Sequence, residues 1–215
     1  MAIQLIGAGG AVAEVDPTFD AMRTTARPPE AAGAFRFAGV SGLTTGIAAN
    51  AALFLFRNPA ADKLCILQFL KVRAAVITGF TAAQEIGFDV LAFRNWQVDA
   101  GGTLVSNAGN NMKRRTSLAA SIANIRVPAA AALTTPAAPA VADGNPFMAG
   151  VGKTLAAAAT VHDVAIEETM DINVGDYPTI FGQNEGFAVR NSILMGAAGT
   201  VRWNVTIGWI EALTY

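Results

Sequence analysis

Few side chains in this 215-residue chain are of the types that perform catalysis. There is one histidine, His162, and one cysteine, Cys65. A single histidine leaves nearly every histidine-dependent mechanism with one candidate, so a hydrolase of this kind would use His162 with Asp163. A single cysteine also excludes an intramolecular disulfide and a metal site built from several cysteines. We therefore expect that the protein is not an enzyme and has no catalytic, cofactor-binding or metal-binding residue and no cofactor.

Two glycine-containing segments look like parts of nucleotide-binding motifs. Leu5–Val12 (LIGAGGAV) has valine where the dinucleotide fingerprint needs its third glycine, and Pro17 would end the helix that should hold the pyrophosphate. Gly150–Thr154 (GVGKT) reproduces the end of a phosphate-binding loop, but Phe147 stands where that loop should begin with glycine. A turn at residues 143–146 (DGNP) also replaces the strand that must precede such a loop. We expect neither segment to bind a nucleotide.

The clusters of charged residues are more typical of solvated surfaces than of binding sites. An acidic cluster offers oxygen ligands for calcium or, with its histidine, for a transition metal, but its spacing matches no defined calcium loop. A basic run, Lys113–Arg115, lacks the interleaved aromatic residues that stack on bases, so it favours a solvated loop or a salt bridge between subunits. Cys65 lies in an apolar run and is expected to be an inert core thiol. The acidic cluster consists of His162, Asp163, Glu167, Glu168 and Asp171.

The charge content narrows the choice of environment. Charged residues make up 14% of the chain, against about 25% in an ordinary soluble domain. Hydrophobic residues reach 53%, and the mean hydropathy is +0.40. With so few charges, the chain either lies in a membrane or turns much of its surface toward other protein. The net charge of −1 creates no global field that would attract nucleic acid or an anionic bilayer, so a nucleic-acid partner is not expected.

Membrane insertion and export are both disfavoured. The longest uncharged stretch, Phe37–Phe56, is long enough to span a bilayer but contains serine, threonine, asparagine and glycine residues, and its apolar residues gather at Leu53–Phe56. This pattern favours two short strands around a turn rich in glycine and threonine. The N-terminus, MAIQLIGAGGAVAEVD, has no basic segment and reaches acidic residues early, unlike a secretory signal. We therefore attribute the apolar excess to contacts between copies of the chain.

We divide the chain into an extended N-terminal arm, residues 1–34, and a single β-sandwich domain, residues 35–215. Prolines break up the arm, which leaves room for one helical turn at most. Within the domain, residues 127–146 form a long surface connection, because three prolines interrupt the alanines of residues 127–141. Many short strands without β–α alternation predict a mainly β, antiparallel sandwich that resembles a jelly roll and has little helix. The one sizeable helix is expected at Lys153–Ala165, and Arg115–Val127 is either a short helix or a strand.

Several segments have the composition of strands. The C-terminal segment Thr200–Trp209 (TVRWNVTIGW) alternates strictly between apolar and polar residues, which predicts a strand with one face buried. Gly186–Val189 and a turn at Gly196–Gly199 precede it and predict a hairpin. Further strands are expected at Ala51–Asn58, Lys63–Thr78 and Gly87–Arg94. The expected core residues are Phe54, Phe56, Phe69, Phe88, Phe93, Val201, Trp203, Val205, Ile207 and Trp209.

A set of short segments spread over most of the chain has a recognisable pattern of strand and turn residues. The segments are Arg27–Glu30 (RPPE), Ser41–Leu43 (SGL), Phe80–Glu85 (FTAAQE), Gly109–Asn111 with Arg115–Ser117, Asn184–Asn191 (NEGFAVRN), Met195–Gly199 (MGAAG) and Trp209–Glu211 (WIE). Taken together, they resemble the small virion structural proteins of tailed bacteriophages. Because these are strand and turn residues, the resemblance implies a context and no site. It implies a non-enzymatic protein that is assembled in the host bacterial cytoplasm and located in the virion.

Within a virion we favour a capsid decoration or cement protein, which stabilises the head through contacts with its own copies, as in a trimer, and with the major capsid protein. Its N-terminal arm would lie on a neighbouring subunit. Two local hypotheses accompany this interpretation: Asn184–Gly186 forms a tight turn, and Arg190 pairs with an acid across an interface. The subunit number, the symmetry and the choice between head and tail stay open.

The alternative is a tail, baseplate or fibre-associated β-sandwich that binds a carbohydrate or a host receptor. Such a module should expose an aromatic side chain beside polar ones, because sugars stack on aromatic rings while polar groups bind their hydroxyls. Trp96, followed by Gln97 and Asp99, is the one place in the sequence where such a site would start. This alternative therefore requires Trp96 to be exposed.

Overall fold

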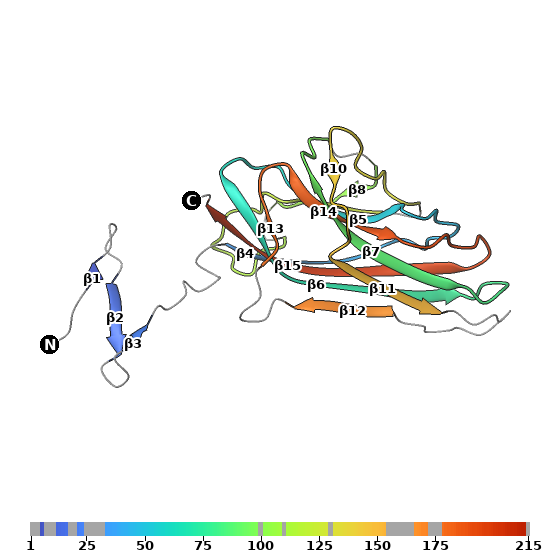
Figure 1. Ribbon diagram of the computed structural model, residues 1–215, viewed down its shortest axis with the longest axis horizontal. Coiled ribbons are helices and arrows are strands. Elements are labelled where there is room, and N and C mark those ends of the chain that lie inside the picture. Colours follow the sequence, from blue (N-terminus) through green and yellow to red (C-terminus); the bar gives the residue numbers. More distant parts are fainter. Residues whose placement is uncertain are drawn as a thin grey trace.

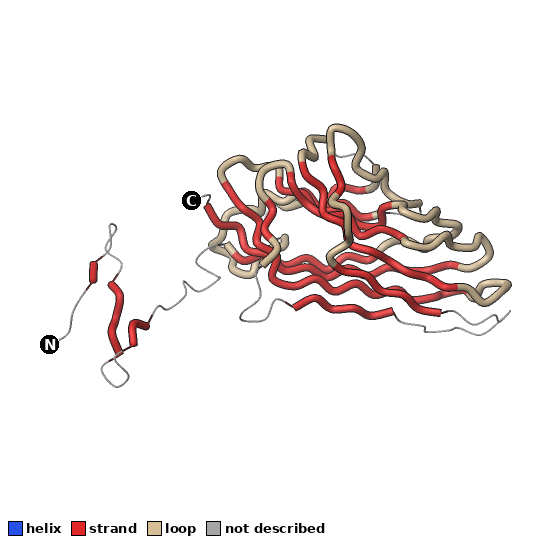
Figure 2. Tube along the Cα trace, in the orientation of Figure 1, coloured by secondary structure: helices blue, strands red, loops and turns tan. Residues whose placement is uncertain are grey.

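The computed structural model describes residues 5–6, 12–16, 21–23, 33–98, 101–108, 111–128, 131–153, 166–171 and 178–213. In this part of the chain all regular secondary structure is β-strand, and no helix occurs (Figure 2). Two antiparallel sheets enclose the main hydrophobic core (Figure 1). The prediction of a mainly β, sandwich-like fold with little helix is confirmed.

The larger sheet has seven strands in the order β10-β7-β14-β5-β9-β8, with β11 also pairing with β7. The smaller sheet has five strands in the order β12-β6-β15-β4, with β13 also pairing with β6. The seven-stranded sheet consists of β5 (Ala52–Asn58), β7 (Glu85–Arg94), β8 (Thr103–Leu104), β9 (Asn124–Val127), β10 (Val141–Ala142), β11 (Met148–Lys153) and β14 (Glu185–Asn191). The five-stranded sheet consists of β4 (Ala34–Val40), β6 (Lys63–Thr78), β12 (Ile166–Asp171), β13 (Ile180–Phe181) and β15 (Thr200–Leu213).

The pairing of the eight principal strands follows jelly-roll order. In chain order these strands are β4, β5, β6, β7, β11, β12, β14 and β15. The first pairs with the last, the second with the seventh, the third with the sixth and the fourth with the fifth. β15 also pairs with β6, and β14 also pairs with β7. These pairings join the four strand pairs into two sheets, as in a jelly roll. The extra strands β8, β9 and β10 come from the segment between β7 and β11.

The alternating sequence of β15 places one face of this strand against the other sheet. Its apolar positions 201, 203, 205, 207 and 209 are each at most 4% exposed, as predicted. The ring of Trp209 meets Phe56 of β5 edge-on at 5.4 Å, and Phe56 stacks on Phe187 of β14 at 5.4 Å. Four of the five phenylalanines expected in the core are buried. Phe69 is half-buried and lies 5.9 Å from the guanidinium of Arg36.

A second hydrophobic cluster covers the other face of the seven-stranded sheet. Every residue of β5 is buried, which explains the continuous apolar sequence of residues 52–56, because a strand covered on both faces needs no polar side. Leu133, in the proline-containing connection, is 4% exposed and donates its backbone N–H to Ala52 at 2.7 Å. The predicted connection at residues 127–146 therefore packs against the sheet and is not a simple surface link. The cluster comprises Ala52, Leu55, Leu91, Phe93, Trp96, Leu133 and Ala188.

The predicted hairpin between Gly186–Val189 and the C-terminal strand is wrong. Gly186–Val189 lies inside β14, which pairs with β5 and β7 in the seven-stranded sheet, whereas β15 belongs to the five-stranded sheet. The turn residues Gly196–Gly199 are part of a loop that crosses from one sheet to the other. Glycine-rich turn chemistry identifies a change of direction but does not specify whether the next strand pairs with the previous one.

The remaining sequence predictions fall partly outside the described residues. In the arm, three short strands form a small antiparallel sheet: β1 (Leu5–Ile6), β2 (Val12–Asp16) and β3 (Ala21–Arg23). The other residues of the predicted arm up to 32 are outside the described part, as are residues 154–165 of the predicted helix, whose first residue, Lys153, ends strand β11. Of Arg115–Val127, only Asn124–Val127 forms regular structure, the strand β9.

Of the turn expected at Asn184–Gly186, only Asn184 lies in a turn, which a hydrogen bond from the N–H of Glu185 to the carbonyl of Gly182 closes at 3.2 Å, whereas Glu185 and Gly186 begin β14. Asn184 has a φ of 58°, in the left-handed region that asparagine tolerates better than most residues. Gly186 then lies opposite Arg57 of β5. A Cβ at position 186 would fall against the carbonyl oxygen of Phe56 and 2.8 Å from the Cα of Arg57. These are backbone atoms of a paired strand, so the sheet would have to separate locally.

We expect Gly186→Ala to lower the free energy of unfolding by about 1–3 kcal/mol, because the added methyl group overpacks the seven-stranded sheet. Gly144→Ala is the matched control, since a Cβ at position 144 meets no atom within 4 Å. Chemical denaturation of both variants measures the difference. Equal stability of the two alanine variants would contradict the close strand approach at Gly186.

Candidate functional site

The two glycine-containing segments do not form phosphate-binding loops. Gly150–Lys153 lies in the extended strand β11 and pairs with β7, with Lys153 opposite Glu85. A phosphate-binding loop must instead wrap its backbone N–H groups around the phosphate, which a paired strand does not do. Thr154 is outside the described residues. Leu5–Ile6 forms β1, while residues 7–11 of the other motif are outside the described part.

Trp96 is buried and is not available as a sugar-binding platform. Its side chain is 1% exposed, its ring lies 5.9 Å from that of Phe93, and its indole N–H donates to the carbonyl of Val98 at 2.9 Å. The guanidinium of Arg57 donates a hydrogen bond to the backbone carbonyl of Trp96 at 3.0 Å and so holds this segment in place. The carbohydrate-binding alternative required exposure of Trp96 and loses that support. Asp99 lies outside the described residues.

The basic run Lys113–Arg115 helps to close the free edge of β4. The backbone N–H of Arg36 donates to the carbonyl of Met112 at 2.8 Å, and that of Arg114 donates to the carbonyl of Ala34 at 3.2 Å. The run is therefore held by main-chain hydrogen bonds beside an edge strand. Such pairing protects the strand from uncontrolled association with other chains.

Arg190 pairs with an acid inside its own chain. Its guanidinium donates two hydrogen bonds to the carboxylate of Asp89, at 2.8 and 2.7 Å, across the neighbouring strands β14 and β7. Both side chains are largely buried, at 16% and 13% exposure. This geometry supplies the partner that the sequence analysis had placed across an interface.

The acidic cluster gives no described metal site. His162 and Asp163 lie outside the described residues, and the side chains of Glu167, Glu168 and Asp171, on β12, are not described either. Within the part of the chain whose side chains are described, no three His, Cys, Asp or Glu residues come close enough together to hold a metal ion.

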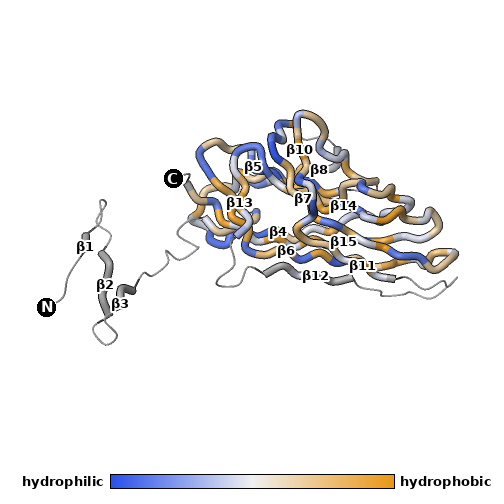
Figure 3. Tube along the Cα trace, viewed as in Figure 1, coloured by the Kyte–Doolittle hydropathy of each residue, from blue (hydrophilic) through white to orange (hydrophobic). Residues whose placement is uncertain are grey.

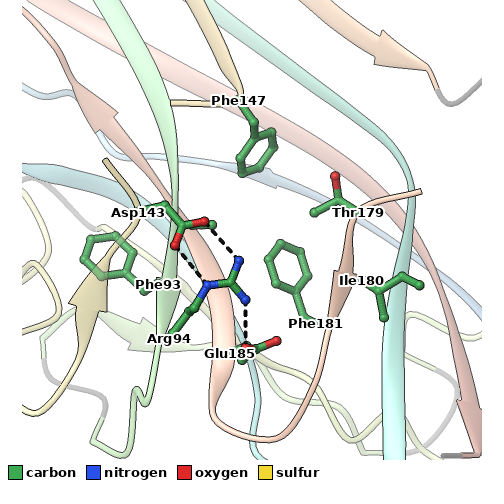
Figure 4. Close-up of a pocket in the computed structure, with 9 residues that line it drawn as sticks. Phe93, Arg94, Asp143, Phe147, Thr179, Ile180, Phe181 and Glu185 are labelled. Atoms are coloured by element: carbon green, nitrogen blue, oxygen red, sulfur yellow. Dashed lines mark hydrogen bonds and ion pairs between the residues drawn. The ribbon is translucent and has the colours of Figure 1, made fainter. Parts of the chain in front are cut away.

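One small cleft opens between the edges of the two sheets, beside β7, β10 and β13 (Figure 4). Its volume is about 140 Å³, well below the roughly 300–1,000 Å³ of most ligand sites. Arg94 lies at its mouth and donates two hydrogen bonds to Asp143, at 3.0 and 3.1 Å, and one to Glu185, at 3.0 Å. The cleft is lined by Ala92, Phe93, Arg94, Asp143, Phe147, Thr179, Ile180, Phe181 and Glu185.

The charged residues of this cleft bind one another and hold neighbouring segments together. The hydrogen bonds from Arg94 to Asp143 and then to Glu185 raise the pKa of the guanidinium, so Arg94 stays charged and engaged with both carboxylates. The two carboxylates that line the cleft, Asp143 and Glu185, both accept hydrogen bonds from Arg94. The cleft thus joins β7 and β14 to the segment after β10 at the sheet edge and offers little room for a substrate.

A buried carboxylate, Glu211 in β15, ties the insertion between β7 and β11 to the C-terminal strand. Its Oε1 accepts hydrogen bonds from Ser121 Oγ at 2.6 Å, from the backbone N–H of Ile122 at 3.0 Å and from the indole of Trp209 at 3.2 Å. Its Oε2 lies 3.8 Å from Nζ of Lys63. Glu211 is 5% exposed, so these contacts replace water around a charged group.

Three loops meet at the end of the sandwich where β15 begins, and none of them contains a charged residue. We call this surface the uncharged loop end. In Figure 3 the tube is mostly orange to pale there, whereas loops beside the labels β5 and β10 are deep blue. A fourth connection, residues 154–165, is outside the described part. The three loops are residues 41–51 (SGLTTGIAANA), 79–84 (GFTAAQ) and 192–199 (SILMGAAG).

Hydrogen bonds join these loops to one another and turn their polar groups inward. Asn191 is fully buried, and its side-chain amide donates to the carbonyls of Ile47, Ala48 and Ile193 at 3.0, 3.1 and 2.6 Å. The hydroxyl of Thr45 donates to Ala197 at 2.6 Å. Gln84 accepts from the N–H of Gly196 at 3.0 Å. The loops are therefore held together and present an uncharged outer surface.

The outer surface of the uncharged loop end is made of small residues and two leucines. Leu43 is 43% exposed and Leu194 is 68% exposed. The sequence already contained the signal for this surface, namely three separate uncharged stretches, but only the first was noticed, as a candidate membrane span. The other exposed residues are Thr45, Gly46, Ala48, Ala49, Asn50, Thr81, Ala82, Ala83, Ala197 and Ala198.

Comparison of the chain with protein-family models, with curated proteins and with solved structures finds no match. In the described part of the chain, no helix has the length and hydropathy needed to cross a membrane. The function must therefore be argued from the fold and the surfaces.

We expect Glu211→Ala to destabilise the fold by about 3 kcal/mol, because three buried donors lose their acceptor and Lys63 loses its counter-charge. Glu211→Gln keeps an acceptor oxygen for the three donors and should cost less. Chemical denaturation of the two variants measures both losses. An alanine variant as stable as the glutamine variant would show that the hydrogen bonds to Oε1 contribute nothing.

Cys65 should react with a thiol reagent only when the fold opens. Burial, and next the nearby charge of Glu211, raise the pKa of the Cys65 thiol well above its ordinary value of 9.0. Because the folded pKa exceeds the unfolded one, the contribution of this thiol to stability is intact below about pH 8.5 and falls as the pH rises further. Ellman's reagent at pH 8 should label Cys65 at the unfolding rate. Rapid labelling of the native protein, as fast as in guanidinium, would contradict its burial.

Proposed function

We propose that this chain is a non-enzymatic virion structural protein of a tailed bacteriophage, most consistent with a capsid decoration or cement protein. It would stabilise the head through contacts with its own copies, as in a trimer, and with other virion proteins such as the major capsid protein. It would assemble in the host bacterial cytoplasm and remain in the virion.

The observation that carries this proposal is the surface chemistry of the jelly roll. In a chain with only 14% charged residues, the three described loops at one end of the jelly roll contain no charge, and the buried side-chain amide of Asn191 binds their backbone carbonyls. Depletion of charge is typical of the central part of protein interfaces. The jelly roll is a fold found in viral capsid proteins, but also in lectins and cupins, so the fold alone supports the context only by analogy.

An enzyme or a small-ligand binder is less well supported. The described cleft is small, and its arginine is engaged by two carboxylates. The tail or fibre module that binds a carbohydrate or receptor lacks its exposed tryptophan, because Trp96 is in the core. A tail or baseplate position without sugar binding stays as the alternative to the head.

The N-terminal arm has a place in this proposal as a contact with a neighbouring subunit. The described part of the domain begins at Gly33, whose carbonyl accepts a hydrogen bond from the backbone N–H of Glu211 at 2.9 Å. A truncation after residue 32 therefore preserves this contact and the start of β4 at Ala34.

The proposal predicts that the protein is present, in many copies, in particles of the phage or prophage whose genome encodes it. Mass spectrometry of purified particles measures the copy number relative to the major capsid protein, and antibody labelling in the electron microscope locates it. Labelled heads are the expected result, and labelled tails would select the alternative. Mature particles that lack the protein would contradict a virion role.

A variant without residues 1–32 tests the arm in the same particles. We expect it to melt at the temperature of the full chain but to be recovered in particles at a strongly reduced copy number. Full incorporation of the truncated protein would remove the arm from the proposal and leave the virion role intact.

A further inference from the structure

We propose that the uncharged loop end is the surface through which copies of this chain contact one another around a rotation axis. This inference deepens the proposed function, since it names the surface and the partner, a second copy. It concerns residues 41–51, 79–84 and 192–199, with Leu194 and Leu43 as the principal apolar contacts.

The electrostatics of a symmetric assembly favour this surface. In a ring of identical subunits, a charge near the axis meets the same charge on every neighbour, and in an interface of low dielectric constant such like charges repel strongly. A surface at an axis must therefore lack charges or hold them in opposite pairs. The three described loops contain no charge at all, so this surface is compatible with its own copies.

The charged residues that border these loops in sequence lie on the strands. Glu85, which follows the second loop, is exposed at the start of β7 and lies opposite Lys153 in the register of β7 and β11. Arg190, which precedes the third loop, is bound to Asp89 by two hydrogen bonds. Arg202 belongs to the polar side of β15, opposite the buried face of Trp203, and so projects from the sheet and not from the loop end.

The loops are also preorganised for contact. The side chains of Asn191, Thr45 and Gln84 fix the three loops to one another through hydrogen bonds, of which the Thr45 bond is exposed. Met195 and Phe80, one from each of two loops, are each 2% exposed and anchor them in the core. A surface that is already ordered loses little conformational entropy on binding, so small apolar residues can contribute net affinity.

Other occupants fit the surface less well. A membrane-binding loop usually carries tryptophan or tyrosine with lysine or arginine, which anchor it among headgroups. The exposed residues here are alanine, threonine, glycine, asparagine and two leucines. A different protein that recognised this end could not form a salt bridge with the three described loops. A second copy needs no salt bridge there, because its own loops are uncharged as well.

The test places charges of either sign at Leu194. Leu194→Asp and Leu194→Lys are made in the full-length chain and compared with the wild type by native mass spectrometry. Each variant alone should lose the oligomer and be found at the single-chain mass of 22.2 kDa, because every copy carries the same charge near the axis. An equal mixture of the two should form oligomers that contain both variants, because their charges now attract.

Val141→Asp and Val141→Lys are the matched controls. Val141 is 62% exposed, close to the 68% of Leu194, but lies in β10, at the other end of β7 from the uncharged loop end. These variants should keep the wild-type oligomer. Thermal melting of all four proteins verifies that surface charge has not unfolded them.

Three results would overturn the inference. They are a wild type that stays at the single-chain mass at all concentrations, Leu194 variants that keep the wild-type oligomer, and variants that dissociate but do not recombine when mixed. Binding of a single-chain wild type to phosphatidylcholine vesicles, abolished by Leu194→Asp, would assign the surface to a membrane instead. Particles that lack the protein would reject the virion role while the mixing result stands, so the two failures are distinguishable.

Discussion

The contact between the aromatic side chains of the two sheets is the interaction on which the rest of the structure depends. Phe56 of β5 stacks on Phe187 of β14 and meets Trp209 of β15 edge-on, both at 5.4 Å. In jelly-roll order the first principal strand pairs with the last, for example at Ala34 and Ile210. The core therefore forms only when segments from opposite ends of the domain sequence come together. Burial of these large rings compensates the entropy of closing such long loops.

The same core determines which surfaces remain for other molecules. The inner faces of both sheets pack against each other in the main core. The proline-containing connection packs through Leu133 on the other face of the seven-stranded sheet. Part of the apolar excess in the composition is therefore consumed within one chain. Residues 41–51, 79–84 and 192–199 form an ordered surface without charge at one end of the sandwich. This surface, more than the total hydrophobicity, argues for an assembly.

Local sequence was sufficient for individual strands but not for their connections. The spans of β6 and the buried positions of β15 follow from alternation, because one face of each strand lies against a core. The β14–β15 hairpin was wrong because a turn does not specify the sheet to which the next strand belongs. Trp96 could not be placed from its polar neighbours, since its burial depends on a connection more than thirty residues later in the sequence, at Leu133. The uncharged loop end likewise exists only because the fold brings three distant segments together.

The measurement that tests the central claim most directly is the mass of the purified wild-type protein in solution, by light scattering over a wide range of concentrations. The account predicts an oligomer of fixed subunit number, which does not grow as the concentration rises, because contacts around a rotation axis close on themselves. A mass of 22.2 kDa at every concentration would contradict it, since the uncharged loop end would then be exposed without a second copy to cover it.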